Sequence, residues 1–287
     1  MTKRREELVV EGLRRLLNGT SRVSPRRAGQ IGYRLLSRPK RPTPKPEDKA
    51  FLAEATTERM MLAGIPIQTY HWVGDGPGVL LLHGWSSSSG RWSSYYPALR
   101  KAGFAIYAFD APAQGRSGGK NFNGIDYAAV LKDYVEHLDV PPAYWVGHSG
   151  GGMAIMYYLS QLNCRILPQR VVAMSVPAEL TDFINKFQNM LSLRPQVVDG
   201  IEREFTRRFQ LKFSDFSPRE YAKDIEVPGL IIHDVGDDLA PIQGAEAIYE
   251  NWKNSCLIIT EGLGHTLDCG EVVELVTDYL LLQDHEV

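Results

Sequence analysis

The sequence predicts an α/β protein built on a doubly wound, mostly parallel β-sheet with an inserted helical cap. From about residue 60 onward, short apolar runs typical of buried strands alternate with stretches at helical spacing, which is the pattern of such a sheet. Between Val176 and Val227 this alternation stops, and apolar residues repeat only at helical spacing, which predicts the cap. The length of 287 residues and the hydrophobic content of 44% are enough to fill a substantial core.

The first 46 residues form a basic N-terminal arm. They hold 13 Lys or Arg against 3 Asp or Glu, whereas the remaining residues hold 19 basic and 31 acidic side chains. Apolar residues near helical spacing predict an amphipathic helix, and the stretch "SRPKRPTPKP" predicts a stiff, extended connector. The arm could contact anionic lipid or nucleic acid. We favour an arm bound to the acidic remainder of the chain, and we expect no nucleic-acid partner.

The sheet is predicted to begin with an antiparallel hairpin and to continue with parallel strands. The hairpin is "MMLAGIPIQTYHWV", which turns at Ala63-Gly64. The strand candidates that follow are "GVLLLH", "FAIYAFD", "AYWVGH", "RVVAMSV", "GLIIHD" and "SCLIIT". Helices are predicted over residues 92–101, 125–138, 153–162, 242–252 and 272–282.

The cap is predicted over about residues 177–224. Two helices are indicated by Leu180, Phe183, Ile184, Phe187 and Leu191, and by Val198, Ile201, Phe205 and Phe209. A third, short helix is predicted to open at "SPRE", with Ser217 as its N-cap. Because the insertion follows a strand, it would arise at the carboxyl edge of the sheet, where ligands of such sheets bind. We therefore expect it to cover the site.

Cysteines and apolar runs exclude several classes of protein. Cys164, Cys256 and Cys269 are odd in number and widely spaced, so they indicate neither a disulfide framework nor a metal site. No apolar run approaches 18 residues, and no signal peptide is evident. These observations favour a reducing, cytoplasmic setting. We expect no cofactor, and the oligomeric state stays open.

The stretch "YWVGHSGGGMAIMYYL" carries one serine where an apolar strand becomes a helix-patterned run. Residues 147–151 match G-x-S-x-G, the sharp strand-to-helix turn that presents a nucleophilic serine at the edge of a sheet. Ser149 is the predicted nucleophile. The alternative is a glycine-rich loop that only packs a helix closely against a strand.

A serine hydroxyl needs a base, and the base needs a carboxylate to orient it. Of the seven histidines, only His265 lies in a loop after the last strand candidate, within "GLGHTLD". The stretch "IIHDVGDDLAP" supplies Asp234, Asp237 and Asp238 at a strand end, and spacing alone does not choose among them. The chain order of serine, aspartate and histidine is the order found in α/β-hydrolases.

Developing negative charge on a carbonyl oxygen must meet preorganised N–H donors. The backbone N–H of Gly150 follows the nucleophile directly, and the loop "LLLHGWSSSSGRW" suggests the N–H of Trp85 as the second donor. The alternative for this loop is a mobile serine-rich connection.

From Gly64 to the C-terminus the chain resembles the α/β-hydrolase superfamily, through His83-Gly84-Trp85, "FDAPAQGRSGG", "GHSGGG", "HDVGDDLAP" and "GLGH". It is similar in particular to bacterial cytosolic esterase-like members, in which a histidine often stands at the position of Gln114. That histidine lies outside the catalytic triad. The family's D-x-x-x-P spacing selects Asp237, four residues before Pro241, over Asp238. The resemblance implies a hydrolase domain over residues 47–287 and no cofactor or metal.

We therefore expect a carboxylesterase-like serine hydrolase that acts on a small, apolar ester through an acyl-enzyme on Ser149. Thioester, lactone or C–C bond cleavage would use the same machinery. The alternative from another class is a hydrolase-fold protein that binds a small molecule without turnover. Trp85, Phe183 and Phe187 are the candidate pocket residues, although helix periodicity equally allows the two phenylalanines to be core. Peripheral membrane contact through the arm is not favoured.

Overall fold

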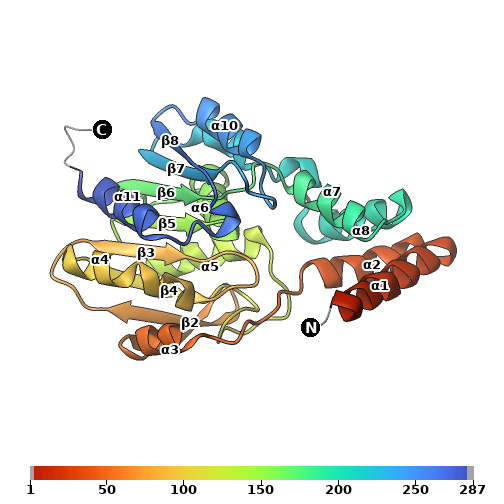
Figure 1. The fold of residues 1–287 in the computed structure, drawn as a ribbon, viewed down its shortest axis with the longest axis horizontal. Coiled ribbons are helices and arrows are strands. Elements are labelled where there is room, and N and C mark those ends of the chain that lie inside the picture. Colours follow the sequence, from red (N-terminus) through yellow and green to blue (C-terminus); the bar gives the residue numbers. More distant parts are fainter. Residues whose placement is uncertain (1–2, 283–287) are drawn as a thin grey trace. The chain divides into compact units, whose positions relative to one another are not determined.

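The chain divides into two compact units in a computed structural model that describes residues 3–282. Unit 1 combines the N-terminal segment up to Arg38 with the insertion Glu179–Ser217. Unit 2 comprises Pro39–Ala178 and the chain from Pro218 onward, and it contains the sheet (Figure 1). No helix in the described part of the chain is long and apolar enough to cross a bilayer.

The sheet of unit 2 has eight strands in the order β1-β2-β4-β3-β5-β6-β7-β8. The pairs β1·β2 and β2·β4 are antiparallel, and every other neighbouring pair is parallel, so the predicted mostly parallel sheet with an antiparallel start is confirmed. The strands are β1 (Thr56–Leu62), β2 (Ile65–Trp72), β3 (Gly78–Leu82), β4 (Ala105–Phe109), β5 (Tyr144–His148), β6 (Arg170–Met174), β7 (Gly229–Asp234) and β8 (Ser255–Thr260).

The opening hairpin turns where the sequence predicts it. Leu62 pairs with Ile65, and the two residues between them, Ala63 and Gly64, have φ values of 47° and 72°. Two consecutive residues at positive φ match the twist of the flanking strands, which is why a two-residue turn of this kind joins antiparallel strands.

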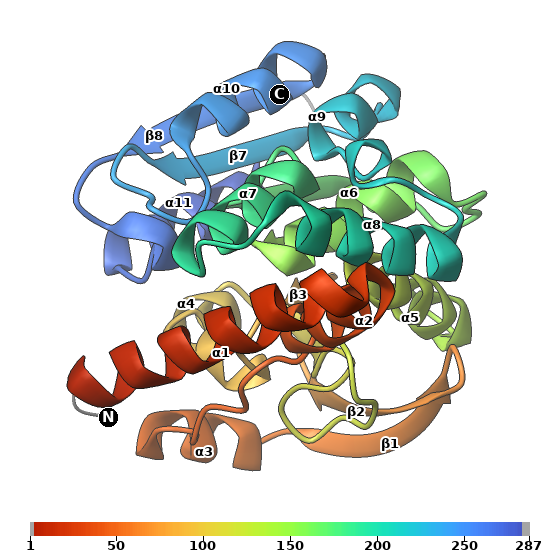
Figure 2. The same cartoon turned by 90° about the vertical axis from the view of Figure 1, so that its right-hand side faces the viewer.

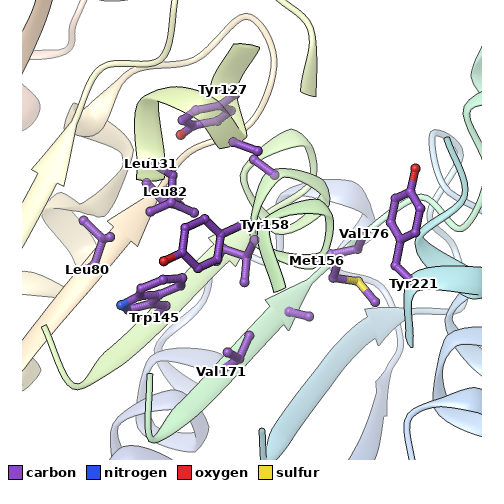
Figure 3. Packing of buried hydrophobic residues seen from close by; sticks show 14 of the residues in the cluster. Leu80, Leu82, Tyr127, Leu131, Trp145, Met156, Tyr158, Val171, Val176 and Tyr221 are labelled. Carbon is purple, nitrogen blue, oxygen red and sulfur yellow. The ribbon is translucent and has the colours of Figure 1, made fainter. Parts of the chain in front are cut away.

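Helices cover both faces of the sheet because alternate residues of each strand point to opposite sides. On one face Leu80, Trp145 and Val171 pack with Tyr158 and with Leu131 of the covering helices (Figure 3). On the other face Val79, Leu81 and Val172 pack with residues of α3, α4 and α11. The helices of unit 2 are α3 (Pro46–Ala53), α4 (Tyr96–Lys101), α5 (Gly124–His137), α6 (Gly150–Gln161), α9 (Pro218–Tyr221), α10 (Ile242–Asn251) and α11 (Gly270–Leu281).

Two helix predictions need correction. The predicted helix over residues 92–101 is a 3₁₀ helix at Ser89–Ser94 followed by α4, since Pro97 lacks an N–H and fits only the first turn of a helix. The helix predicted over residues 153–162 begins at Gly150, so the glycines after Ser149 form its first turn. Helix α3 was not predicted.

Unit 1 is helical and consists of α1 (Lys3–Val23), α2 (Pro25–Leu36), α7 (Leu180–Met190) and α8 (Pro195–Phe209), with a 3₁₀ turn at Phe213–Asp215. Helices α2 and α8 pack side by side (Figure 2). They approach so closely that a β-carbon on Gly29 would lie 2.1 Å from the carbonyl carbon of Gly200. Helix α2 was not predicted, and the stretch expected to be an extended connector holds no helix or strand over residues 38–45.

Candidate active site

Ser149 lies at the junction of β5 and α6, with φ 51° and ψ −117°. A non-glycine residue at positive φ costs free energy and persists only where its surroundings fix it. Here the backbone N–H of Ser149 donates to Met174 O at 2.8 Å, and Ser149 O accepts from the N–H of Met153 at 2.9 Å. The predicted strand-to-helix turn is therefore present as a strained element held by β6 and α6.

The glycines around Ser149 leave room for the backbone of neighbouring segments. A β-carbon on Gly147 would lie 2.6 Å from the backbone nitrogen of Gly152, and one on Gly151 would lie 2.2 Å from Leu82 O. Such distances are far below van der Waals contact, so any side chain at either position would push the helix away from the strands. The close approach places Ser149 at the carboxyl edge of the sheet, beside the ends of β3 and β6.

The structure brings Ser149, His265 and Asp237 into one hydrogen-bonded chain. His265, in the 3₁₀ turn Gly264–Thr266, places Nε2 at 3.0 Å from Ser149 Oγ and Nδ1 at 2.8 Å from Asp237 Oδ2. The Asp237 side chain is buried, and the His265 side chain is 17% exposed. An imidazole between a hydroxyl and a carboxylate can accept a proton from the first while the second stabilises the resulting charge.

Asp237 is fixed by its own backbone neighbours. Its Oδ1 accepts from the N–H groups of Leu239 at 2.7 Å and Ala240 at 2.8 Å, which leaves Oδ2 for His265. Burial alone would raise the pKa of Asp237, but the hydrogen bonds from His265, Ala240 and Leu239 outweigh it and lower the pKa. The carboxylate is therefore ionised at neutral pH, as a partner of an imidazolium must be.

The two competing aspartates lie elsewhere. Asp234 Oδ2 accepts from Thr260 Oγ1 at 2.8 Å and from the N–H of Leu263 at 2.9 Å, so it organises the loop that carries His265. Burial would raise the pKa of Asp234, yet these and other hydrogen bonds lower it. Asp238 is exposed, and its side chain makes no hydrogen bond or ion pair with the residues that the structure describes.

Two side chains that the sequence reasoning did not single out hold the His265 turn. His148 donates from Nε2 to His265 O at 2.8 Å, and Arg91 donates from Nη2 to Thr266 O at 3.0 Å. Burial, reinforced by the positive charge of Arg91, lowers the pKa of His148 well below its ordinary value, so this imidazole stays neutral. Because both contacts go to backbone carbonyls, no residue pattern in the sequence indicates them.

The predicted oxyanion donors belong to segments that lie against each other. A β-carbon on Gly150 would lie 3.6 Å from the backbone nitrogen of Trp85 and 2.9 Å from Cζ of Phe122. Trp85 precedes Ser86, whose φ is 54°, in the turn after β3. The assignment of Trp85 and Gly150 as N–H donors stays a prediction. Phe122, beside the elbow, was missed, since nothing in "KNFNG" distinguishes it.

Buried polar groups hold the chain at the end of β3, where the turn with Trp85 and Ser86 begins. His83 Nε2 accepts from the N–H of Ala111 at 2.9 Å, so Nδ1 carries the proton and donates to Gly84 O at 2.8 Å. Burial lowers the pKa of His83, in keeping with a neutral ring. The buried Asp110 accepts from the N–H of Ser89 at 2.8 Å and from the N–H of Arg116 at 2.7 Å. The "FDAPAQGRSGG" stretch thus forms a loop folded around a carboxylate.

The candidate pocket residues fall into both units. Trp85, which is 41% exposed, belongs to unit 2, whereas Phe183 and Phe187 belong to α7 of unit 1. A pocket formed by the three stays a prediction. In unit 1, Phe205 packs against Phe209 and Phe213 with ring centroids 5.0 and 5.2 Å apart. Phe205 and Phe213 are buried core residues, whereas Phe209 is half-buried. Within residues 3–282, no group of three or more His, Cys, Asp or Glu is placed to hold a metal ion.

A mostly parallel sheet with a strained serine at the end of a central strand, hydrogen-bonded to a histidine and an aspartate from later loops, is the arrangement of the α/β-hydrolase class. The chain belongs to this family: residues 77–227 match the family model described as alpha/beta hydrolase fold.

The chain is similar to several characterised proteins at low identity. It is 26% identical over 255 residues to a bifunctional esterase/perhydrolase of Acinetobacter calcoaceticus, covering 72% of this chain and 91% of that protein. It is 27% identical over 237 residues to a non-heme haloperoxidase of Rhodococcus erythropolis, covering 67% and 86%. A meta-cleavage product hydrolase from Pseudomonas fluorescens shares the fold, with a TM-score of 0.60 and 18% identity, over 79% of this chain and 98% of that one.

Proposed function

We propose that this protein is a serine hydrolase that cleaves a carboxylic ester through an acyl-enzyme on Ser149. The observation that carries the proposal is the continuous chain from Asp237 Oδ2 through His265 to Ser149 Oγ, with steps of 2.8 and 3.0 Å. The similarity to an esterase/perhydrolase of comparable length supports it. A small, apolar substrate and a cytoplasmic location remain expectations from the sequence.

The residues have distinct roles in the proposed reaction. His265 Nε2 accepts the hydroxyl proton as Ser149 Oγ attacks the ester carbonyl carbon, and the carbonyl oxygen becomes an oxyanion bound by the N–H groups of Trp85 and Gly150. The imidazolium then donates this proton to the leaving alcohol, which departs as the acyl-enzyme forms. A water molecule gives a proton to His265 as it attacks the acyl carbon. The bond to Ser149 Oγ then breaks, the imidazolium returns the proton to Oγ, and the carboxylic acid is released.

Binding without turnover is the competing function, because the family fold can hold a ligand without reacting with it. The intact hydrogen-bonded chain favours turnover. A fluorophosphonate probe separates the two functions, since it labels a serine only when a base has activated it. Stoichiometric labelling at Ser149 together with turnover in a graded series of acyl esters is expected. Absence of both in the folded protein would support binding alone.

Replacing Ser149 by alanine tests the nucleophile. We expect the kcat for ester hydrolysis to fall by at least about 10³-fold, because the acyl-enzyme cannot form. Folding should be intact, since alanine carries the same β-carbon as serine and adds no steric demand at φ 51° and ψ −117°. Circular dichroism and thermal melting serve as the control. A variant that keeps more than a few per cent of the activity would remove Ser149 from the mechanism.

A further inference from the structure

The connector Pro39–Lys45 leads from the N-terminal helices into unit 2 without forming a helix or strand. Its prolines at positions 39, 42 and 44 restrict the backbone, so the segment is semi-rigid even though it is mostly exposed. All contacts described below join residues of unit 2.

Arg41 binds one loop with its whole guanidinium group. Nε donates to Ala113 O at 3.1 Å, Nη1 to Gly115 O at 3.2 Å and Nη2 to Ser117 O at 2.9 Å. Ala113 and Gly115 have φ values of 63° and 47°, so the backbone bends twice within this short loop. Only the planar fork of arginine presents several donors in fixed directions, and lysine offers one flexible point charge.

The same connector and the same loop hold the turn that follows β3. The backbone N–H of Lys40 donates to Ser86 Oγ at 3.0 Å. From the loop, Oε1 of the fully buried Gln114 accepts from the N–H of Ser87 at 3.1 Å. The turn is therefore held directly by Lys40 and indirectly by Arg41, through the loop that carries Gln114. Ser86, at positive φ, would relax without such support.

We propose that Arg41 is a positioning residue for the oxyanion hole: it fixes the 113–117 loop and, with Lys40, the turn that presents the N–H of Trp85. The proposal rests on the proposed function in so far as Trp85 acts in catalysis. Oxyanion donors stabilise a transition state because they are preorganised, and a displacement of about 1 Å can cost about 10² in rate. The connector is thus the outer support of a catalytic turn.

The first test measures the turn itself in the full-length protein. Hydrogen–deuterium exchange of peptides spanning residues 84–90 is compared in wild type, Arg41→Ala and Arg59→Ala. Arg59 is the matched control, because its Nη1 donates to Arg116 O at 3.4 Å and so contacts the same loop outside the connector. We expect exchange in these peptides to rise by about tenfold in Arg41→Ala and to stay unchanged in Arg59→Ala. Equal exchange in all three proteins would overturn the proposal.

The second test measures catalysis. We expect Arg41→Ala to lower kcat by about 10- to 100-fold with KM nearly unchanged, and to weaken a trifluoromethyl ketone inhibitor by a similar factor. Arg41→Lys should recover little of the loss, and added guanidinium ion should restore part of the activity of Arg41→Ala only. A loss of kcat that tracks a lower Tm and resists this rescue would show a merely structural role and overturn the proposal.

The two tests separate the two proposals. If the exchange rates change as expected but the wild-type protein hydrolyses no ester and resists fluorophosphonate labelling, Arg41 positions the turn and the proposed function is wrong. If the wild-type protein is an active esterase and Arg41→Ala matches it in kcat and in inhibitor affinity, the proposed function stands and the role of Arg41 in positioning the oxyanion hole is wrong.

Discussion

Asp237 and Asp238 are adjacent in the chain but stand in opposite environments. The Asp237 side chain is buried and accepts three hydrogen bonds, from Leu239, Ala240 and His265, whereas Asp238 is exposed. In an asparagine at position 237, the oxygen can still accept from the two backbone N–H groups. The amide nitrogen then faces His265 Nδ1 and donates to it, so the ring carries its proton on Nε2 and cannot accept one from Ser149.

We therefore predict that Asp237→Asn lowers kcat by at least about 10², and that Asp238→Asn lowers it by less than about tenfold. Purified variants of equal thermal stability are compared on one activated ester. The reverse pattern would move the acid to Asp238. If both substitutions lower kcat only slightly, the orienting carboxylate comes from elsewhere in the chain.

Glu204 of α8 is a buried carboxylate in unit 1 with two arginine partners. Hydrogen bonds from Arg207 and Arg208, at 2.8 to 3.0 Å, together with their charges, lower its pKa from 4.5 to about 2, although burial acts in the opposite direction. A depressed pKa in the folded state means that Glu204 contributes stability above pH about 4.5 and loses it as the pH falls toward 2.

We predict that Glu204→Gln lowers the free energy of unfolding at pH 7 and that the difference from wild type narrows between pH 5 and pH about 3. Urea titrations across this range measure it. Glu220→Gln is the control, because Glu220 pairs with Lys223 at the surface of unit 2 and such pairs contribute little. A difference that does not change with pH would mean that the ion pairs of Glu204 add no stability.

At the scale of elements, the strands were predictable because a sheet covered on both faces needs runs of consecutive apolar residues, as in "VLLL" of β3 and "LII" of β7. Helix α2 was missed because "PRRAGQIGYRLL" has few large apolar residues and two glycines, which read as breakers. Those glycines face α8 and allow the two helices to approach closely. Such a close approach leaves no periodic pattern in the sequence.

In the candidate site, too, the sequence predicts residues that belong to local motifs and misses contacts that depend on the three-dimensional structure. The sequence predicts Ser149 in a strand-to-helix turn and His265 in a loop because their motifs are local, and the structure brings their side chains to 3.0 Å. Residue spacing alone does not select the orienting carboxylate among Asp234, Asp237 and Asp238, since the three side chains lie close together in the chain and differ in the direction they point. His148 and Arg91 bind backbone carbonyls, which every residue offers, so only the three-dimensional structure identifies their partners.

The close contact between α2 and α8 leads to a prediction about the stability of these helices. A β-carbon on Gly29 would lie 2.1 Å from backbone atoms of Gly200, where no side chain can yield, whereas one on Gly12 of α1 would meet no atom within 4 Å. We expect Gly29→Ala to lower the free energy of unfolding of unit 1 by about 1–3 kcal/mol and Gly12→Ala to raise it by about 0.5–1 kcal/mol. Chemical denaturation of both variants measures the difference. Two stabilised variants would show that the helices do not cross at these glycines.

At the scale of the whole molecule, one compact unit is built from segments far apart in the sequence. The N-terminal helices pack on the insertion within unit 1: Asn18 Oδ1 accepts from the N–H of Arg194 at 2.9 Å, and Asn18 Nδ2 donates to Ser192 O at 3.0 Å. The N-terminal helices up to Arg38 and the insertion Glu179–Ser217 therefore pack together in unit 1, where Val197 and Ile201 are fully buried.

This arrangement predicts that a protein beginning at Pro39 keeps unit 2 folded while the insertion loses its structure. Without α2, the side chains of Val197 and Ile201 lose the helix that covers them, at about 1.5–3 kcal/mol for each exposed side chain. Unit 2 keeps its own sheet, both covering helix layers and the connector with Arg41. Trypsin should then cleave within α8, at Arg203, Arg207 or Arg208, much faster than in the full chain, as mass spectrometry of the early fragments would show. Gly12→Ala in the full chain should be as resistant as wild type. A truncated protein whose α8 resists trypsin as well as the full chain does would mean that the insertion folds without the N-terminal helices.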